Sequence, residues 1–306
     1  MPAAPTTITT HACAKINLAL SVGPPVPPKG YHPIASWFVP IALGDNLELA
    51  TLPVGEPSRF VIAWADDAPK PSPIDWPIEK DLAVRAHELL QERAGRELPV
   101  AMSLRKRTPV GGGLGGGSSD AAAMLRACIA LFDLKLSRDE LAEMSAKLGS
   151  DIAFFLDADD SGSILEAPRS AIVTGFGERI ERLPPIAAEI LLLIPPFGCP
   201  TGAVYQSYDR SPRPLEERRV RLLATEAAKR KTVSSGELFN DLAAPACIVT
   251  PRLGDVYVRL RREVSVPVHV TGSGSTMFAL DANASAEAAI RAAAPELVVV
   301  RTRIGP

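Results

Sequence analysis

A glycine-dense loop constrains this chain more than any other feature. Residues 109–120 read P-V-G-G-G-L-G-G-G-S-S-D, and six of the 22 glycines fall within positions 111–117. Glycine reaches backbone conformations that are closed to residues with a Cβ, so the N–H groups of such a loop can converge on an anion. An apolar pattern with helical spacing follows, and the positive end of that helix would face the same anion. The members of this pattern are Ala121, Leu125, Cys128, Ile129 and Phe132.

Three kinds of anion loop and one structural alternative compete for this segment. A Walker A loop requires Lys directly after its last Gly, where this chain has Ser118. A Rossmann fingerprint fits only through glycine density, and four residues separate the loop from the preceding strand, whereas a Rossmann loop opens directly from it. The third possibility is the phosphate loop of another nucleotide-binding fold. A flexible linker is the structural alternative, and the apolar helix that follows disfavours it.

Composition and charge exclude several classes of protein. The formal charge is 33 − 35 = −2, which argues against a strongly basic nucleic-acid binder. No secretory signal pattern and no apolar run long enough to cross a bilayer is present, so we expect neither a membrane nor a nucleic-acid partner. The four cysteines form no C-x-x-C pair, which favours free buried thiols and a cytoplasmic protein.

The hydrophobic pattern predicts an α+β chain of two domains, residues 1–162 and 163–306, joined by the polar segment 157–162. We expect Asp81 to cap a helix, and Ser137 with Glu140 to form a capping box for another. The predicted strands cover residues 14–22, 45–50, 98–104, 163–173, 190–194, 277–280 and 297–304, with one more that begins at residue 264. The predicted helices cover residues 81–93, 121–132, 137–148, 214–229 and 284–293.

The loop resembles the central phosphate-loop motif of the GHMP kinase superfamily. Two further motifs of that superfamily occur in the expected order, A-K-I-N-L at 14–18 and V-T-G-S-G-S-T-M-F at 270–278. Within the superfamily the chain most resembles the 4-diphosphocytidyl-2-C-methyl-D-erythritol kinase family of non-mevalonate isoprenoid biosynthesis. The supporting segments are G-Y-H at 30–32, L-G-S-D-I-A-F-F at 148–155, P-T-x-x-V-Y at 200–205 and F-N-D at 239–241.

The resemblance implies a fold and an activity. The fold would combine an N-terminal ribosomal-S5-like domain with a C-terminal ferredoxin-like domain, in a monomer or weak homodimer. The activity would be ATP-dependent phosphorylation of a hydroxyl on a substrate that carries a cytidine diphosphate group. The alternatives are a homoserine or mevalonate type of kinase, a nicotinamide-dependent oxidoreductase, and a non-catalytic nucleotide-binding module. ATP would contact Pro109, Val110, Gly111, Gly112, Gly113, Leu114, Gly115, Gly116, Gly117, Ser118 and Ser119.

The resemblance also assigns catalytic roles to Lys15 and Asp151. Asp151 would accept the hydroxyl proton, although an aspartate just after a helix stop often only caps the next turn. Lys15 would be a buried ammonium near Asp151 that keeps this carboxylate ionised; the alternative is an edge-strand charge facing solvent. Asn17 shares the strand face of Lys15 and would bind substrate or position Asp151. Mg²⁺ is expected with ATP, and its ligands stay unassigned, with Ser118 or Ser119 as candidates.

The cytidine would lie near Tyr31 and His32, with Tyr205 as the second ring of a sandwich, unless these are ordinary half-buried tyrosines. Thr201 belongs to the same substrate segment. Gly272 and Gly274 would allow a second loop to approach the helix after the phosphate loop, or the substrate phosphates, closely; a tight turn between strands is the plain alternative. Two positions depart from the family, since Lys29 replaces an acidic residue and Asp81 replaces Asn. The second departure puts an adenine contact by residue 81 in doubt.

Overall fold

The computed structural model describes residues 6–28, 30–156 and 166–305, and the chain forms two compact units. Neither unit is one continuous segment. The first unit comprises Met1–Ala14, Leu43–Thr108 and Gly115–Pro168, and the second comprises Lys15–Ala42, Pro109–Leu114 and Arg169–Pro306. Two long strands, β1 (Thr7–Val22) and β2 (Ile34–Thr51), contribute residues to both units. The domain boundary expected at residues 162 and 163 lies outside the described residues and stays a prediction.

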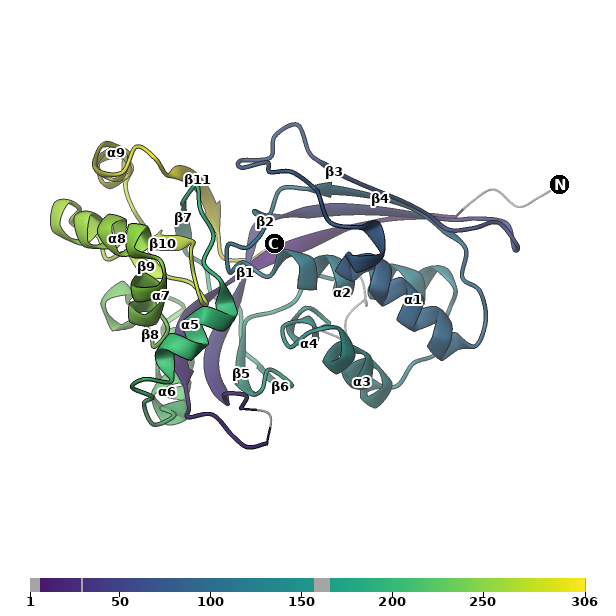
Figure 1. Cartoon of the computed structure of the whole chain (residues 1–306), viewed down its shortest axis with the longest axis horizontal. Coiled ribbons are helices and arrows are strands. Elements are labelled where there is room, and N and C mark those ends of the chain that lie inside the picture. The colour runs from purple at the N-terminus through teal and green to yellow at the C-terminus, as the bar shows by residue number, and fades with distance from the viewer. Residues whose placement is uncertain (1–5, 29, 157–165, 306) are drawn as a thin grey trace. The chain divides into compact units, whose positions relative to one another are not determined.

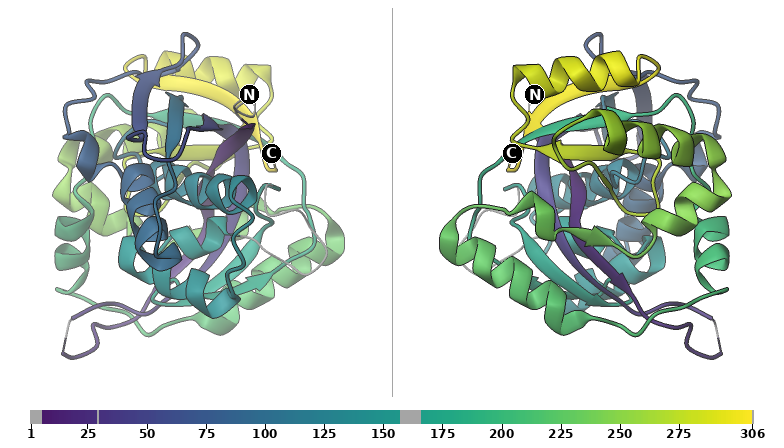
Figure 2. Two further views of the ribbon diagram at one scale, coloured as in Figure 1. Left: turned by 90° about the vertical axis from the view of Figure 1, so that its right-hand side faces the viewer. Right: turned by 90° about the vertical axis from the view of Figure 1, so that its left-hand side faces the viewer.

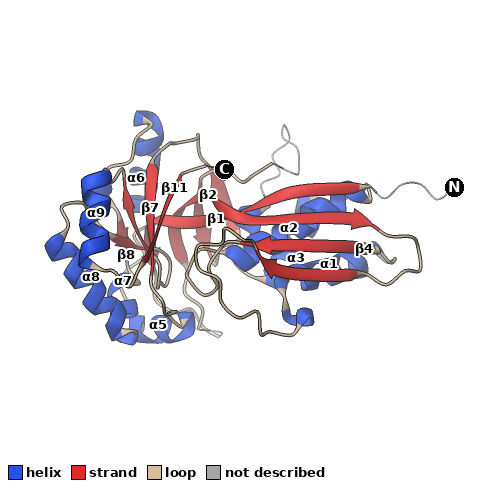
Figure 3. Cartoon of the chain, turned by 90° about the horizontal axis from the view of Figure 1, so that it is seen from above, coloured by secondary structure: helices blue, strands red, loops and turns tan. Residues whose placement is uncertain are grey.

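The first unit contains one sheet layer, in the strand order β3-β4-β2-β1. Strand β3 (Arg59–Trp64) runs parallel to β4 (Val100–Lys106), and β4 runs antiparallel to β2. In β4 the side chains of Val100, Met102 and Leu104 are buried, as the two-residue period of a strand requires. Figure 3 shows these strands in front of the helices of this unit.

Local sequence signals explain where the helices of the first unit begin. These helices are α1 (Leu82–Ala94), α2 (Gly116–Leu131), α3 (Arg138–Leu148) and α4 (Ile152–Phe155) (Figure 1). Asp81 Oδ1 accepts the N–H of Ala83 at 2.9 Å, and Ser137 and Glu140 form the predicted capping box. Both capping predictions are confirmed. The apolar helix after the glycine loop is also confirmed, and most of its side chains are buried.

The second unit contains a four-stranded antiparallel sheet in the order β11-β7-β10-β9. These strands are β7 (Glu189–Ile194), β9 (His269–Val270), β10 (Met277–Leu280) and β11 (Val298–Arg303). The C-terminal helix and β11, both yellow, lie side by side in Figure 2. A hydrogen bond from Arg291 to the Val299 carbonyl joins them. The helices of this unit are α5 (Thr201–Tyr208), α6 (Glu217–Arg230), α7 (Ala243–Val249), α8 (Pro251–Glu263) and α9 (Ala284–Ala293).

Three short strands of the second unit extend the sheet that contains β1 and β2. Strand β5 (Ala171–Gly175) pairs with β2 and with β6 (Arg179–Arg182), and β8 (Phe239–Asn240) runs parallel to β1. The pairing of β8 brings Asn240 level with Leu20, although 220 positions separate them in sequence. This pairing places the F-N-D segment beside the strand that carries A-K-I-N-L.

The α+β class is confirmed, and the element predictions are mostly right. Helix α9 has the predicted bounds, whereas the strand expected at 163–173 is observed only from Ala171 on, and residues 163–165 lie outside the described residues. The elements that were not predicted are helices α4, α5, α7 and α8 and strands β3, β6 and β8. Helix α8 begins at a proline, which is acceptable in the first turn because proline lacks an N–H and an N–H at that position would have no partner within the helix.

The cysteine and membrane expectations can be compared with the structure. All four cysteines are free; Cys13, Cys128 and Cys199 are buried and Cys247 is half-buried. Burial raises the pKa of Cys13 and Cys128 to about 12, so both thiols are held in the neutral form. Within the described part of the chain, no helix is both long and apolar enough to cross a membrane.

Candidate active site

Lys15 is a buried lysine in the middle of β1. Its side chain is about 4% exposed, and its Nζ lies 4.6 Å from the ring centre of Phe38. The Nζ donates to Asn17 Oδ1 at 2.9 Å, as expected for two residues on one strand face. The alternative of an edge-strand lysine that points to solvent is therefore wrong. Burying an ammonium is costly unless it has polar partners. Asn17 Oδ1 and the face of the Phe38 ring are such partners for Lys15.

Asn17 connects this lysine to the third glycine motif. Its backbone N–H donates to Thr271 Oγ1 at 2.9 Å, and its Oδ1 accepts from the same hydroxyl at 3.3 Å. Its Nδ2 donates to Ser36 Oγ at 2.8 Å. The carboxamide is thus held at both ends by buried groups of the second unit. The expectation that Asn17 binds substrate or positions Asp151 stays a prediction.

The phosphate loop and the third glycine motif touch through their backbones. The N–H of Lys15 donates to Leu114 O at 2.9 Å, and the N–H of Thr276 donates to Gly112 O at 3.3 Å. Gly113 has a φ of +76°, and a Cβ built on it would lie 2.9 Å from the carbonyl oxygen of Thr271. The third motif therefore lies close against the phosphate loop itself, and this approach requires glycine at position 113. The approach expected toward the helix after the loop, or toward substrate phosphates, stays a prediction.

Some residues of the phosphate loop are buried and others are exposed to solvent. Gly112 and Leu114 are buried, whereas Val110, Gly111 and Gly117 are exposed. The backbone of the loop passes from the second unit to the first after Leu114, and α2 begins two residues later. Ser118 is half-buried in the first turn of α2, and Ser119 is buried. The loop therefore leads directly into a helix N-terminus, which is the geometry that favours an anion.

A buried ion network, which the sequence analysis did not find, holds both flanks of the phosphate loop in the first unit. Lys106 Nζ lies 2.7 Å from Asp45 Oδ2 and 2.5 Å from Asp120 Oδ2. Asp45 Oδ1 also accepts the N–H groups of Arg107 and Thr108, at 2.6 and 2.7 Å. Lys106 ends β4, and Asp120 lies in the first turns of α2. The network therefore fixes the start of α2 relative to the end of β4.

The charges of this network are strongly coupled. Burial alone would lower the pKa of Lys106, but the carboxylates of Asp120 and Asp45 outweigh burial and raise this pKa above its ordinary value. The pKa of Asp120 is raised well above its ordinary range, first by burial and then by the charge of Asp45. Asp120 Oδ1 is buried and has no hydrogen-bond partner among the described residues. The strand period offered a signal for this site, because Lys106 follows Val100, Met102 and Leu104 on the buried face.

Asp151 lies at the start of α4 in the first unit. It is the residue before the first turn, with φ −84° and ψ −10°, and it is half-buried. Its side chain makes no capping hydrogen bond to that turn. The structural alternative, in which Asp151 merely caps α4, is therefore wrong. Its role as a base stays a prediction.

The G-Y-H segment presents one exposed ring. Tyr31 is 60% exposed and forms an edge contact with Phe176, whose ring centre is 6.4 Å away. Phe176 lies in the turn between β5 and β6 and is itself 47% exposed. Two exposed aromatic rings side by side are notable in a chain with 5% aromatic residues. The sequence analysis missed Phe176, although it lies between two glycines in G-F-G.

His32 faces inward. Its Nδ1 lies 2.9 Å from the Gly23 carbonyl and its Nε2 lies 3.2 Å from Asp209 Oδ1, so protein acceptors face both ring nitrogens. Tyr205 packs on His32 with ring centres 5.1 Å apart. The two tyrosines predicted to sandwich one base thus have different ring neighbours, Phe176 for Tyr31 and His32 for Tyr205. The binding roles of these residues stay predictions.

The other predicted positions have structural partners of their own. Thr201 Oγ1 lies 2.8 Å from Ser273 Oγ, which ties α5 to the third glycine motif between Gly272 and Gly274. Both oxygens of Asp81 are used, one by the Ala83 N–H and the other by Trp76 Nε1. Residue 29 lies outside the described residues. In the described ranges, no group of three or more His, Cys, Asp or Glu side chains is placed to hold a metal ion.

Comparisons with known proteins agree with this geometry. The family described as GHMP kinases N terminal domain matches residues 81–158. A 4-diphosphocytidyl-2-C-methyl-D-erythritol kinase from Kineococcus radiotolerans is 36% identical over 279 residues, which cover 89% of this chain and 81% of that protein. One from Caulobacter vibrioides is 36% identical over 294 residues, 90% of each chain. A crystal structure of 4-(cytidine 5'-diphospho)-2C-methyl-D-erythritol kinase has a TM-score of 0.74 at 30% identity, covering 98% of this chain and all of the other.

The chain belongs to the 4-diphosphocytidyl-2-C-methyl-D-erythritol kinase family. This family lies within the GHMP kinases, so the two-domain α+β fold of that superfamily is confirmed. The L. major mevalonate kinase has a TM-score of 0.63 at 16% identity and shares the fold alone. Membership of the family accounts for the three ordered motifs, two of which, with Pro109–Leu114 of the phosphate loop, meet in the second unit.

Proposed function

We propose that this protein transfers the γ-phosphoryl group of ATP to a hydroxyl of 4-diphosphocytidyl-2-C-methyl-D-erythritol. The observation that carries the proposal is the identity to kinases of this name along about nine-tenths of the chain. The backbone contacts between the phosphate loop and the third glycine motif support it, because they hold Gly112 and Gly113 of the loop beside a second glycine-containing turn. A homoserine or mevalonate substrate has no such support, since those relatives share only the fold.

In the proposed reaction each motif has a separate task. The loop at 109–119 and the N-terminus of α2 bind the phosphates of ATP. Asp151 accepts the proton of the attacking hydroxyl, and the Lys15 ammonium favours the ionised form of the reacting oxygen. Tyr31, with Phe176 beside it, offers an exposed aromatic face to the cytosine base. His32 and Tyr205 support the segment that carries Tyr31.

Mg²⁺ belongs to the same proposal. It would enter with ATP and neutralise charge on the β- and γ-phosphates. Since no cluster of three metal-ligating side chains occurs in the described ranges, phosphate oxygens and water would supply most of its ligands. Ser118, half-buried in the first turn of α2, is the hydroxyl of the loop best placed to add one more.

The decisive experiment measures ADP release by the purified protein with ATP, Mg²⁺ and 4-diphosphocytidyl-2-C-methyl-D-erythritol. Homoserine and mevalonate serve as alternative acceptors in parallel reactions. ADP release that depends on the cytidine substrate and is inhibited by free cytidine diphosphate supports the proposal. Release with only one of the other acceptors overturns it, as does no release above background. Titration with NADH in place of ATP tests the oxidoreductase alternative.

The base assignment has its own test. An Asp151→Asn variant should bind ATP as the natural protein does but lose turnover by about 10²- to 10⁴-fold, the usual contribution of a general base. An Asp133→Asn variant is the control, because Asp133 is an exposed aspartate whose side chain is 83% accessible. Wild-type turnover by the Asp151 variant would refute the assignment.

A further inference from the structure

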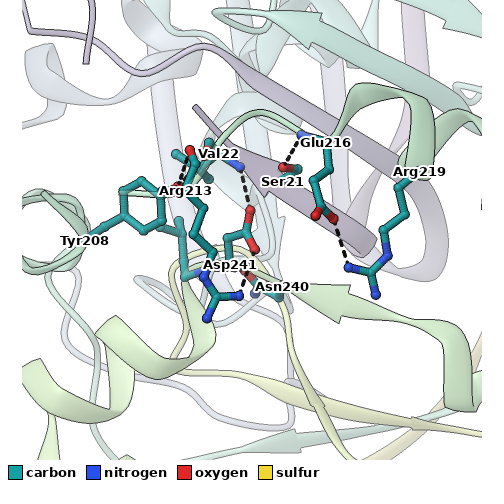
Figure 4. Close-up of polar contacts among 9 residues, drawn as sticks. Ser21, Val22, Tyr208, Arg213, Glu216, Arg219, Asn240 and Asp241 are labelled. Atoms are coloured by element: carbon teal, nitrogen blue, oxygen red, sulfur yellow. Dashed lines mark hydrogen bonds and ion pairs between the residues drawn. The ribbon is translucent and has the colours of Figure 1, made fainter. Parts of the chain in front are cut away.

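The F-N-D segment at 239–241 lies in a polar network of the second unit that the proposed chemistry does not use (Figure 4). Asp241 is nearly buried, and its Oδ2 accepts the N–H of Val22 at 3.0 Å. The backbone N–H of Asp241 donates to Leu20 O at 2.9 Å. Tyr208 Oη donates to the Val22 carbonyl and accepts the N–H of Arg213. The two Asp241 bonds hold the end of β8 against the end of β1.

Asn240 uses this fixed position to hold the third glycine motif. Its Nδ2 donates to the carbonyls of Val270 and Gly272, at 2.7 and 2.8 Å, and its Oδ1 accepts the N–H of Leu242 at 2.9 Å. Both amide hydrogens are therefore bonded to the two carbonyls that flank Thr271. Because the two donors share one planar group, they fix the directions of both carbonyls and with them the backbone of Thr271.

Thr271 in turn holds Asn17. Thr271 is fully buried, and its hydroxyl accepts the Asn17 N–H and donates to Asn17 Oδ1. Ser36 Oγ donates its hydrogen to Ala19 O, so it can only accept from Asn17 Nδ2. The carboxamide of Asn17 is thereby oriented with its oxygen toward the Lys15 ammonium. A flipped amide would place its NH₂ group, a donor, against another donor.

We infer that Thr271 and Asn240 are positioning residues, which orient Asn17 and through it hold the Lys15 ammonium in place. The inference about turnover rests on the proposed function. All the hydrogen bonds in this chain of contacts lie within one unit, and each is between 2.7 and 3.3 Å. Through these bonds Asn240 of the F-N-D segment acts on Lys15 without contacting the reacting atoms.

The first test compares Thr271→Val with Thr271→Ser. Valine keeps the shape of threonine but lacks the hydroxyl, whereas serine keeps the hydroxyl. Thr271→Val should lower kcat about tenfold, the effect of losing hydrogen bonds around a buried charged group, with an unchanged dissociation constant for ATP. Thr271→Ser should keep most of the activity. Thr10→Val is the matched control, since Thr10 is a buried residue of β1 whose hydroxyl has no partner among the described residues.

The second test is Asn240→Asp, which keeps the acceptor for Leu242 but replaces two donors with an oxygen that faces two carbonyls. This variant should also lower kcat about tenfold. Asn283→Asp is its control, because the Asn283 side chain accepts the Ala286 N–H to cap α9 and Asp caps a helix equally well. A purely structural role predicts lower thermal stability with unchanged kcat, and this result would overturn the inference.

A readout that does not need turnover separates this inference from the proposed function. The rate at which acetic anhydride modifies Lys15, followed by mass spectrometry, reports how firmly the amine is held. We expect a several-fold faster reaction in Thr271→Val and Asn240→Asp, and the natural rate in Thr10→Val and Asn283→Asp. Natural rates in all four variants refute the inference, even if the protein is an active kinase. Faster modification in a protein without kinase activity refutes only the proposed function.

Discussion

Replacement of Lys106 by Met tests the buried ion network beside the phosphate loop. Methionine matches the length of the lysine stem but leaves the carboxylates of Asp45 and Asp120, which are at most 1% exposed, without their ammonium. Removing one partner of a buried ion pair typically costs about 3–5 kcal/mol, because the remaining charge stays buried and uncompensated. We expect the free energy of unfolding to fall by about that amount.

The assay is urea unfolding of the full chain followed by far-ultraviolet circular dichroism. The matched control is Lys135→Met, since Lys135 pairs with Asp133 on the surface and both side chains are more than 80% exposed. An exposed pair is typically worth less than about 1 kcal/mol, so this variant should unfold almost as the natural protein does. Equal losses in the two variants would refute the argument from burial.

The pH dependence of an Asp120→Asn variant tests the same network from the acidic partner. Folding raises the pKa of Asp120. At pH values between the ordinary and the raised pKa, the folded state therefore keeps a proton that the unfolded chain has lost. In the natural protein the free energy of unfolding should therefore fall as the pH rises through this window. The variant lacks this group, so this part of the slope should disappear; an unchanged slope would show that Asp120 is not its source.

Three further predictions concern separate parts of the chain. Gly113→Ala should weaken ATP binding at least tenfold, because Ala disfavours a φ of +76° by about 1–2 kcal/mol and its Cβ would lie 2.9 Å from Thr271 O. Gly95→Ala has a similar φ but open space for a Cβ, so calorimetric titration should show unchanged ATP affinity. Tyr31→Ala should weaken cytidine diphosphate binding about 5- to 150-fold, and Tyr31→Phe should not, given about 1–3 kcal/mol for base stacking. Burial lowers the pKa of His269 to about 4, so stability should fall as the pH drops from about 6.5 toward 4, less steeply in His269→Gln.

Much of the site could be predicted because its signals are local. The glycine loop, the Asp81 cap and the Ser137–Glu140 capping box each depend on residues within a few positions of one another. Hydrogen bonds over such short spans are specified by the residues of one segment, so the sequence pattern alone can point to them. Helix α9 was predicted at its exact bounds, and the Asn283 cap that the structure shows at its start is likewise local.

Other predictions required knowledge of neighbours distant in sequence. Lys15 had two sequence interpretations, and only its burial beside Asn17 and Phe38 decided between them. The sequence predicted that Tyr31 and Tyr205 sandwich the base and gave no sign of Phe176. Phe176 lies in a turn between β5 and β6 that is far in sequence from the G-Y-H segment. Helix α8 was not predicted because its first residue is a proline. Proline usually indicates the end of a helix unless a helix is known to begin at that residue.

The sequence by itself determined that a glycine loop precedes an apolar helix, and that three motifs occur in the order of the superfamily. Only the tertiary structure decided what those motifs contact. The pairing of β8 with β1 brings Asn240 beside a strand some 220 residues earlier, and β4 carries Lys106 between Asp45 and Asp120. A local pattern fixes the conformation of its own segment, whereas a buried charge or amide is stable only when distant groups complete its hydrogen bonds.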